Sequence, residues 1–322
     1  MIIAHLGLAD WEKSILQNQL SQHQHLFFKT VEDFSVSELN QNLDEIEVLT
    51  VFIHNHLSAE ILAKMPKLKL IVTRSTGFDH IDLDYAQKHQ IPVCNVPSYG
   101  ENTIAEYSFA LLLALARHIP ELAYRSGECR FDYEGLRGFD LAGKTIGIIG
   151  AGKIGLHAIK IAKGFGMKVL VYDVFKNHFL EEVLGFDYTN LNNLLENSDI
   201  ISVYAPYLPS THHILNESSF AKMKKGVVII NTSRGPLIDT VALVKNLDNG
   251  TVSACGLDVV EDESDLLNCK ANPFLEDLVK RKNVIFTPHS GFFTKDAQER
   301  ILQQTIENIT SFTQGKLQNI VK

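Results

Sequence analysis

Three ionisable side chains of complementary chemistry, Arg234, Glu263 and His289, each follow a short apolar run in the second half of the chain. Such β-branched runs are typical of buried parallel strands, and the carboxyl ends of those strands form the edge where α/β domains bind ligands. A guanidinium binds a carboxylate with its planar fork, and a histidine beside a carboxylate can donate and accept a proton. Singly, each could be an ordinary strand-end or core residue. Together, beside a nicotinamide, they would suffice to reduce a 2-oxo acid.

A glycine-rich segment predicts the nicotinamide cofactor. Gly150, Gly152 and Gly155 form a GxGxxG that directly follows the strand-like TIGIIG and opens a helical pattern. In this motif the first glycine permits a tight turn, the second lets a pyrophosphate approach the backbone, and the third lets helix and strand pack closely. The helix N-terminus then offers N–H groups to the phosphates. A tight turn without a ligand is the alternative, and the complete context favours the cofactor.

An acidic residue at the end of the next strand indicates which dinucleotide binds. Asp173 ends KVLVYD, 18 residues after Gly155. Its carboxylate can accept hydrogen bonds from ribose hydroxyls and would repel a 2′-phosphate, so NAD is expected rather than NADP. Lys176, which follows three residues later, works against this preference.

The elements that must position these residues alternate along almost the whole chain. Short apolar runs separated by helix-length amphipathic segments predict parallel strands in doubly wound α/β domains. One series lies before Pro97 and a second begins after Gly143, so two domains are expected. The predicted fold is a flavodoxin-like substrate domain, formed by 1–98 and 291–322, and a Rossmann NAD-binding domain, formed by 99–290. The C-terminal segment is assigned to the first domain because it follows the completed second series.

Composition excludes several classes of protein. The 322 residues carry 30 Lys and Arg against 38 Asp and Glu, a net charge of −8, which disfavours a nucleic-acid partner. No apolar run is long enough to span a bilayer, and Asp10 interrupts the N-terminus before a signal sequence could develop, so a cytoplasmic protein without a membrane partner is expected. The 13 histidines are scattered without ligand spacing, so no metal is predicted. Four cysteines without a CxxC motif are expected to be reduced: Cys94, Cys129, Cys255 and Cys269.

Several segments together resemble the D-isomer-specific 2-hydroxyacid dehydrogenase family over nearly the whole chain. Within the family, YDVFKN, the loop around Tyr99 and EDESDLLN are most similar to the D-lactate dehydrogenases. The resemblance implies two domains with NAD and the substrate in a cleft between them, and a homodimer formed through the NAD-binding domains. The segments that carry it are RSTGFDHID (74–82), VPSYGENTIAE (96–106), GKTIGIIGAGKIG (143–155), INTSRGPLIDT (230–240), CGLDVVEDESDLLN (255–268) and TPHSGFF (287–293).

Carried over residue by residue, the resemblance gives each catalytic position a role. Arg234 corresponds to the arginine that holds the substrate carboxylate and polarises the 2-oxo group. His289 corresponds to the general acid that protonates the carbonyl oxygen as hydride arrives, and Glu263 to the carboxylate that favours the imidazolium and fixes the ring. Formate-oxidising members have glutamine at the position of Glu263, so this glutamate argues against formate as the substrate.

The same correspondence implies the binding residues. Tyr204 stands where the family often has histidine before the Ala-Pro pair, which leaves that contact open. The expected substrate-binding residues are Thr76 and Gly77, through their backbone N–H groups, with Tyr99 and Arg234. The expected cofactor-binding residues are Gly150, Gly152, Lys153, Ile154, Gly155, Asp173, Ala205, Pro206, Thr211, Thr232, Ser233 and Asp258.

The favoured activity is therefore reduction of pyruvate to D-lactate by NADH, with His289 as general acid. Phe52, Phe292 and Phe293 would provide apolar walls for a methyl-sized side chain. Glyoxylate or hydroxypyruvate reduction is an alternative, because one methyl or hydroxyl group changes discrimination by only about 1–3 kcal/mol. A more distant alternative is an NAD-sensing, corepressor-like binding protein.

Overall fold

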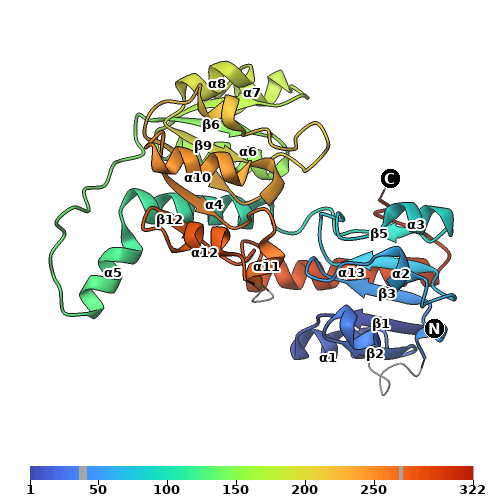
Figure 1. The fold of residues 1–322 in the computed structure, drawn as a ribbon. Helices are drawn as coiled ribbons and strands as arrows, with labels where there is room; N and C mark the ends of the chain where they lie inside the picture. Colours follow the sequence, from blue (N-terminus) through green and yellow to red (C-terminus); the bar gives the residue numbers. More distant parts are fainter. Residues whose placement is uncertain (36–41, 268–270, 322) are drawn as a thin grey trace. The chain divides into compact units, whose positions relative to one another are not determined.

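The protein forms two compact units in the computed structural model, which describes residues 1–35, 42–267 and 271–321 (Figure 1). Unit 1 consists of Met1–Tyr99 and Thr294–Lys322, and unit 2 of Gly100–Phe293. The boundaries expected from the sequence lie at 98/99 and 290/291. Asn268, the last residue of the EDESDLLN segment, and Cys269 lie outside the described residues.

Within the described residues, unit 1 is built on a parallel sheet of five strands in the order β2-β1-β3-β4-β5. This order is the flavodoxin-like doubly wound topology, so the predicted fold is confirmed. Apolar clusters on both faces bury the central strands completely. The strands are β1 (Ile2–Leu6), β2 (Gln24–Phe28), β3 (Val48–Val51), β4 (Leu70–Thr73) and β5 (Val93–Cys94). The helices are α1 (Asp10–Gln19), α2 (Ala59–Leu62), α3 (Leu83–Lys88) and α13 (Lys295–Thr313).

Helix α13 returns the end of the chain to the core of unit 1. Thr294 caps its N-terminus, because the threonine side chain accepts a hydrogen bond from the backbone N–H of Ala297. Leu302, Ile306 and Ile309 then pack with apolar residues of β1, β3 and β4. Burial of these side chains, rather than helix propensity, holds the helix on the sheet.

The described part of unit 2 contains a parallel sheet of seven strands in the order β12-β11-β10-β9-β6-β7-β8. The direction of winding reverses between β6 and β9, which is the Rossmann arrangement that the sequence predicts. The strands are β6 (Thr145–Ile149), β7 (Lys168–Tyr172), β8 (Asp187–Tyr188), β9 (Ile200–Val203), β10 (Val227–Asn231), β11 (Val252–Leu257) and β12 (Val284–Phe286). The helices are α4 (Glu101–Ala116), α5 (Ile119–Gly127), α6 (Lys153–Gly164), α7 (His178–Leu184), α8 (Leu191–Asn197), α9 (Glu217–Phe220), α10 (Thr240–Asp248), α11 (Glu263–Leu267) and α12 (Pro273–Lys280).

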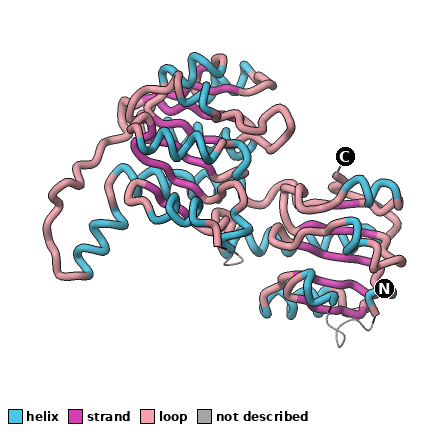
Figure 2. The backbone as a smooth tube through the Cα atoms, viewed as in Figure 1, coloured by secondary structure: helices cyan, strands magenta, loops and turns pink. Residues whose placement is uncertain are grey.

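Helix α5 and the segment after it extend away from the sheet of unit 2 (Figures 1 and 2). His118, in the left-handed region at φ 51°, separates α5 from α4, and Pro120 lies in the first turn of α5, where its missing N–H has no helical partner to lose. None of the nine described residues of α5 is buried. Residues 128–144 then run to β6 without helix or strand (Figure 2).

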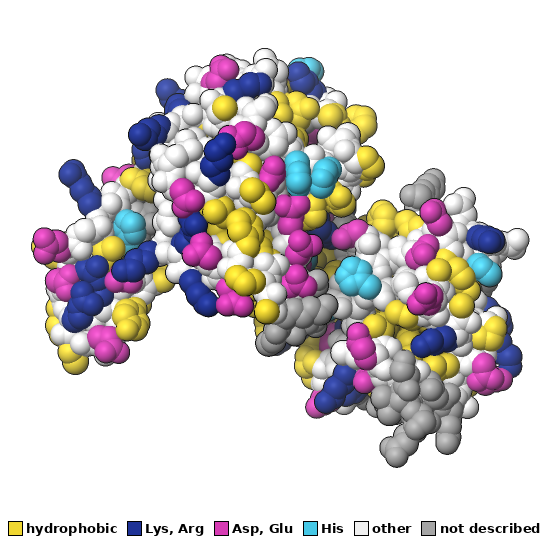
Figure 3. All heavy atoms as spheres, viewed as in Figure 1, with side chains coloured by type: hydrophobic (Ala, Val, Ile, Leu, Met, Phe, Trp, Pro, Cys, Tyr) yellow, Lys and Arg dark blue, Asp and Glu magenta, His cyan; other side chains and the backbone are white. Residues whose placement is uncertain are grey.

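On the face of the molecule shown in Figure 3, basic and acidic side chains are interspersed in both units. A phosphate backbone would need a continuous basic stripe, and this face does not present one. No helix in the described part of the chain combines the length and hydropathy that a bilayer span requires.

Candidate active site

The glycine loop of unit 2 has the geometry of a phosphate-binding turn. Gly150 follows β6 with φ 99°, and a Cβ there would lie 2.7 Å from the backbone N of Ala205. A Cβ at Gly155 would overlap the carbonyl oxygen of Gly150. At Gly152, by contrast, no described atom beyond the adjacent residues lies within 4 Å of the Cβ position, so open space adjoins the N-terminus of α6. This open space at a helix N-terminus fits the pyrophosphate of a dinucleotide.

Thr232 offers a second feature that fits a bound cofactor. It follows β10 and is 8% exposed, yet its Oγ1 atom has no hydrogen-bond partner among the described residues. A buried hydroxyl without a partner costs free energy, so a polar group is expected to approach it. The neighbouring Ser233 hydroxyl donates instead to the carbonyl oxygen of Val203, which joins the ends of β10 and β9.

The remaining predicted cofactor residues contact the chain itself in this structure. Lys153 Nζ lies 3.6 Å from Glu101 Oε1 of α4, and Ile154 packs in the core beside α4 and α6. Thr211 closes the turn after Pro206, since its hydroxyl donates to the Pro206 carbonyl oxygen at 2.7 Å. Tyr204, which precedes Ala205, is buried and bonded to Ser108 of α4 at 2.5 Å. Burial raises the pKa of the Tyr204 phenol, so this residue contributes a neutral packing group.

Asp173 lies at the end of β7 and holds the glycine loop. Its Oδ2 accepts a hydrogen bond from the backbone N–H of Ala151 at 2.6 Å, and its Oδ1 accepts one from Phe175 at 2.8 Å. Each carboxylate oxygen can accept more than one hydrogen bond, so acceptor capacity for ribose hydroxyls remains. The hydrogen bond between Asp173 and the glycine loop was not predicted from the sequence.

Asp258, one of the expected cofactor-binding residues, holds the segment that carries His289 through several hydrogen bonds. The side chain is 2% exposed and accepts hydrogen bonds from Thr287 Oγ1 at 2.6 Å, from the Ser290 N–H at 2.9 Å and from the Gly291 N–H at 2.8 Å. Its backbone carbonyl accepts from the His289 N–H at 2.9 Å. The end of β11 thus fixes the turn that follows β12.

His289 and Glu263 form a pair in unit 2. His289 Nδ1 lies 2.8 Å from Glu263 Oε1, and Glu263 Oε2 accepts a hydrogen bond from the Val260 N–H at 3.2 Å. The histidine backbone has φ 51°, a left-handed conformation that residues other than glycine adopt at a cost. Such conformations concentrate at functional sites, where the surrounding contacts enforce them.

Arg234 lies half-buried after β10, and its segment packs against the segment of Glu263. The Asn231 side chain donates to the Arg234 carbonyl oxygen, and Arg234 Nη1 donates to the Ser233 carbonyl oxygen. Gly235 follows, and a Cβ there would overlap the backbone carbonyl of Val260, to whose N–H Glu263 bonds. The structure therefore brings the segments of all three predicted catalytic residues to one edge of the unit 2 sheet.

Thr76, Gly77 and Tyr99 belong to unit 1, so their place at the same site stays a prediction. Their loop is well ordered by hydrogen bonds. Thr76 Oγ1 donates to the Val96 carbonyl oxygen at 2.8 Å, and the Ser75 hydroxyl donates to the Gly77 carbonyl oxygen at 2.6 Å.

Several residues that shape the site were not identified from the sequence. Gly235 directly follows Arg234, and Gly291 follows His289 by two residues. Both glycines permit close packing, and their positions beside predicted catalytic residues are the sequence signal that could have identified them. Asn231, Tyr107 and Ser290 act through hydrogen bonds that no sequence spacing reveals.

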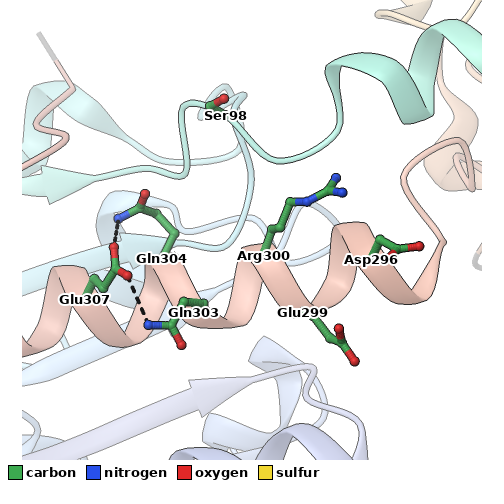
Figure 4. A pocket seen from close by; sticks show the side chains of 7 residues that line it. All are labelled: Ser98, Asp296, Glu299, Arg300, Gln303, Gln304 and Glu307. Atoms are coloured by element: carbon green, nitrogen blue, oxygen red, sulfur yellow. Dashed lines mark hydrogen bonds between the residues drawn. The ribbon is translucent and has the colours of Figure 1, made fainter.

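Unit 1 also carries a cavity of about 490 Å³ along α13 (Figure 4). Arg300 points into it and donates from Nη1 to the Tyr99 carbonyl oxygen at 2.8 Å. Three carboxylates line the cavity together with this one guanidinium, so the net charge of the lining is negative and does not favour a carboxylate substrate. The lining residues are Ser98, Asp296, Glu299, Arg300, Gln303, Gln304 and Glu307. Among the residues that the structure describes, no group of three or more His, Cys, Asp or Glu side chains could hold a metal ion.

The chain is similar to known proteins over most of its length. The sequence profile of the "D-isomer specific 2-hydroxyacid dehydrogenase, NAD binding domain" matches residues 109–291. The D-lactate dehydrogenase of Escherichia coli (strain K12) is 37% identical over 293 residues, which cover 88% of this chain and 89% of that one. The glyoxylate reductase of Thermococcus litoralis is 37% identical over 287 residues, 87% and 84% of the two chains. The crystal structure of the Aquifex aeolicus D-lactate dehydrogenase complexed with NAD and lactic acid matches with a TM-score of 0.89 at 37% identity, covering 97% and 96%.

Proposed function

Because this chain belongs to the D-isomer-specific 2-hydroxyacid dehydrogenase family and is an NAD-dependent enzyme, we propose that its reaction is the reduction of pyruvate to D-lactate. The observation that carries the proposal is the 2.8 Å pair between His289 Nδ1 and Glu263 Oε1 at the edge of the unit 2 sheet. The solved structure described above holds NAD and lactic acid, which supports the choice of substrate.

His289 is the proton donor in this proposal. Glu263 engages Nδ1, so the ring is oriented with Nε2 as the atom that exchanges a proton with the substrate. When bound, NADH supplies the hydride that the carbonyl carbon accepts. The imidazolium then transfers the Nε2 proton to the carbonyl oxygen, which completes the hydroxyl group, and in the oxidation of lactate the neutral ring takes the proton back.

Arg234 binds the substrate carboxylate in this proposal. The Arg234 guanidinium carries five N–H donors, and Nη1 is held by the Ser233 carbonyl oxygen. The bidentate fork fixes the plane of the carboxylate, which presents the adjacent 2-oxo group to the proton donor in one orientation. The positive charge also stabilises the negative charge that develops on the carbonyl oxygen.

The residues that would hold NAD lie along the edge of the unit 2 sheet near β6. The pyrophosphate would lie in the space beside Gly152, at the first turn of α6. Thr232 Oγ1, which is buried without a partner among the described residues, would form a hydrogen bond with a polar group of the cofactor. Asp173 receives the adenosine ribose hydroxyls, and its negative charge disfavours the 2′-phosphate of NADP.

Reduction of glyoxylate or hydroxypyruvate is the second candidate. The 37% identity to a glyoxylate reductase is the observation that favours it. Both reactions use the same proton donor and arginine, and they differ only in the group attached to the 2-oxo carbon. One methyl group changes discrimination by only about 1–3 kcal/mol, so the two acids compete closely.

A homodimer formed through unit 2 is part of the proposal. Four large apolar side chains of α5 and the segment after it are strongly exposed: Ile119 54%, Tyr124 63%, Phe131 82% and Tyr133 80%. Exposed apolar surface of this extent on an extended arm is typical of a protein interface. We expect light scattering to give twice the chain mass; a mass of one chain would contradict the dimer.

The cytoplasmic location stays a prediction.

The experiment that tests the function is the loss of NADH absorbance with a panel of acids: pyruvate, 2-oxobutyrate, phenylpyruvate, glyoxylate, hydroxypyruvate and oxaloacetate. We expect pyruvate to have the highest kcat/KM, and D-lactate but not L-lactate to be oxidised in reverse. Faster turnover of glyoxylate or hydroxypyruvate would establish the second candidate. Silence across the panel with NADH still bound would overturn both and favour an NAD-sensing protein.

A further inference from the structure

Tyr107 of α4 contacts the segment that carries His289, although 183 positions of sequence separate the bonded residues. Its hydroxyl lies 2.9 Å from Ser290 Oγ. The Tyr107 ring also packs against Gly291, where a Cβ would lie 3.3 Å from the ring atom Cδ1. Tyr107 therefore contacts both residues that directly follow His289.

The turn after β12 is held by Asp258 as well as by this tyrosine. The Asp258 carboxylate accepts the N–H groups of Ser290 and Gly291, and Tyr107 bonds to the Ser290 side chain and covers Gly291. The Ser290 hydroxyl lies 3.5 Å from Asp258 Oδ1, so it points towards an atom that can only accept. Tyr107, Ser290 and Asp258 thus form one connected series of polar contacts.

His289 needs such support because of its backbone. A non-glycine residue at φ 51° stays there only where its surroundings over-determine the conformation. The 2.8 Å contact of His289 with Glu263 depends on the direction of the ring, and hence on this backbone. A small change in that direction would separate the proton donor from its target.

The same helix also contacts the predicted cofactor segments. Glu101, at the start of α4, pairs with Lys153 of the glycine loop at 3.6 Å. Ser108, next to Tyr107, bonds to Tyr204, which precedes Ala205. One rigid helix thus connects the turn of His289 with the segments expected to bind NAD.

We propose that Tyr107 is a positioning residue for the hydride- and proton-transfer step, and that it acts on His289 through Ser290 and Gly291. This inference rests on the proposed role of His289 as proton donor. Tyr107 touches neither substrate nor cofactor in the proposal; its hydroxyl fixes the turn, and its ring fills the space that Gly291 leaves.

The test is a double-mutant cycle with Tyr107→Phe, Ser290→Ala and the combined variant, assayed with the 2-oxo acid that the wild-type enzyme reduces fastest. Tyr107→Phe keeps the ring packing and removes only the hydroxyl. We expect each single variant to lower kcat about tenfold with KM changed less than twofold, in line with loss of one hydrogen bond. The combined variant should also lose about tenfold rather than a hundredfold, because both changes break the same bond. Tyr85→Phe, which removes a hydroxyl of α3 in unit 1, is the matched control.

Amide hydrogen exchange gives a readout that does not need activity. We expect Tyr107→Phe and Ser290→Ala each to speed exchange of the Ser290 and Gly291 amides about tenfold, with the amides of β6 unchanged. A kcat within twofold of wild type in Tyr107→Phe, multiplicative losses in the cycle, or unchanged exchange at these two amides would each overturn the inference. A wild-type protein inactive on every acid would instead overturn the proposed function, while the exchange measurement would still decide the position of Tyr107.

Discussion

In each unit a carboxylate pairs with a basic side chain that is distant in sequence, and the two pairs differ in what surrounds them. In unit 1, Arg74 Nη1 lies 3.0 Å from Glu12 Oε1, and the side chains are 3% and 9% exposed. In unit 2, His289 Nδ1 lies 2.8 Å from Glu263 Oε1, and the side chains are 17% and 24% exposed. The geometry is alike, but the first pair is closed to solvent and the second is partly open.

The surroundings of Arg74 suit a structural role. Its Nη2 donates to the carbonyl oxygens of Leu6 and Gly7, its guanidinium lies 5.4 Å from the centre of the Phe52 ring, and Glu12 Oε2 accepts the Ala9 N–H. These contacts tie the start of α1 to the end of β4. Burial lowers the pKa of Arg74, and Glu12 opposes that shift.

The surroundings of His289 suit chemistry. Its backbone is strained, and its carboxylate partner engages only the nitrogen that faces away from the proposed proton transfer. The comparison teaches that the buried pair, whose guanidinium also bonds two backbone carbonyl oxygens, suits a structural role, whereas the partly exposed pair fits the proposed proton transfer.

The largest expected effect is on the pair in unit 2. His289→Gln should lower kcat about 10²–10⁴-fold, because the proton donor is lost, while the NADH dissociation constant changes less than twofold. Stopped-flow turnover and NADH fluorescence titration measure the two quantities. His178→Gln is the matched control, since His178 pairs with Glu181 at 2.6 Å on the surface of the same unit. Full activity of His289→Gln would remove the distinction between the two pairs.

A smaller effect is expected on the pair in unit 1. Glu12→Gln leaves the Arg74 charge buried without its carboxylate, so the free energy of unfolding should fall by about 3–5 kcal/mol. Urea denaturation followed by tryptophan fluorescence measures it, because Trp11 is adjacent in α1. Glu45→Gln, which breaks an exposed pair with Lys67 in the same unit, should change stability little. Equal losses in the two variants would show that burial is not what makes the Arg74 pair structural.

The smallest effect concerns a buried histidine of unit 1 whose ring nitrogens bond to a hydroxyl and to a second imidazole. His5 is bonded to Thr50 and His25, and burial, followed by the charges of His25 and Arg74, lowers its pKa well below 6.5. Above about pH 6.5 the His5 ring is neutral in both the folded and the unfolded chain, so its protonation does not reduce the free energy of unfolding. As the pH falls below that value, His5 binds a proton in the unfolded chain but stays neutral in the folded chain.

Stability should therefore decrease by up to about 1.4 kcal/mol for each pH unit below pH 6.5, until the folded pKa of His5 is reached. Urea denaturation at a series of pH values gives the slope. His5→Gln should reduce it, whereas His89→Gln, at an exposed position of the same unit, should not. An unchanged slope in His5→Gln would assign the acid sensitivity to other groups.

The sequence predicted those parts of the molecule that depend on residue type at a fixed spacing. Both parallel sheets follow from the alternation of apolar runs, and the turn at Gly150 follows from a motif in which only glycine tolerates φ 99° and the close approach of Ala205. The strand ends that carry Arg234 and His289 follow from the same alternation.

The sequence could not predict contacts that depend on the path of a loop. The family resemblance implied Asp258 as a cofactor-binding residue, but its hydrogen bonds reach Ser290 and Gly291, which lie 32 and 33 positions away. The apolar pattern of α4 predicts a buried helix and says nothing about which of its hydroxyls meets Ser290. Such contacts are set by tertiary packing and have no local signature.

The discontinuity of unit 1 has a consequence for synthesis on the ribosome. Residues 1–99 emerge first, but Leu302, Ile306 and Ile309, which complete an apolar face of their sheet, emerge last. At roughly 5–20 residues per second, translation of 100–293 takes about 10–40 s. During that interval unit 2 can fold as a continuous chain. The side chains of Ile3, Val48 and Leu70 stay exposed, because the α13 residues that pack on them have not yet been synthesised. The nascent chain is therefore most prone to aggregate through the unit that is synthesised first.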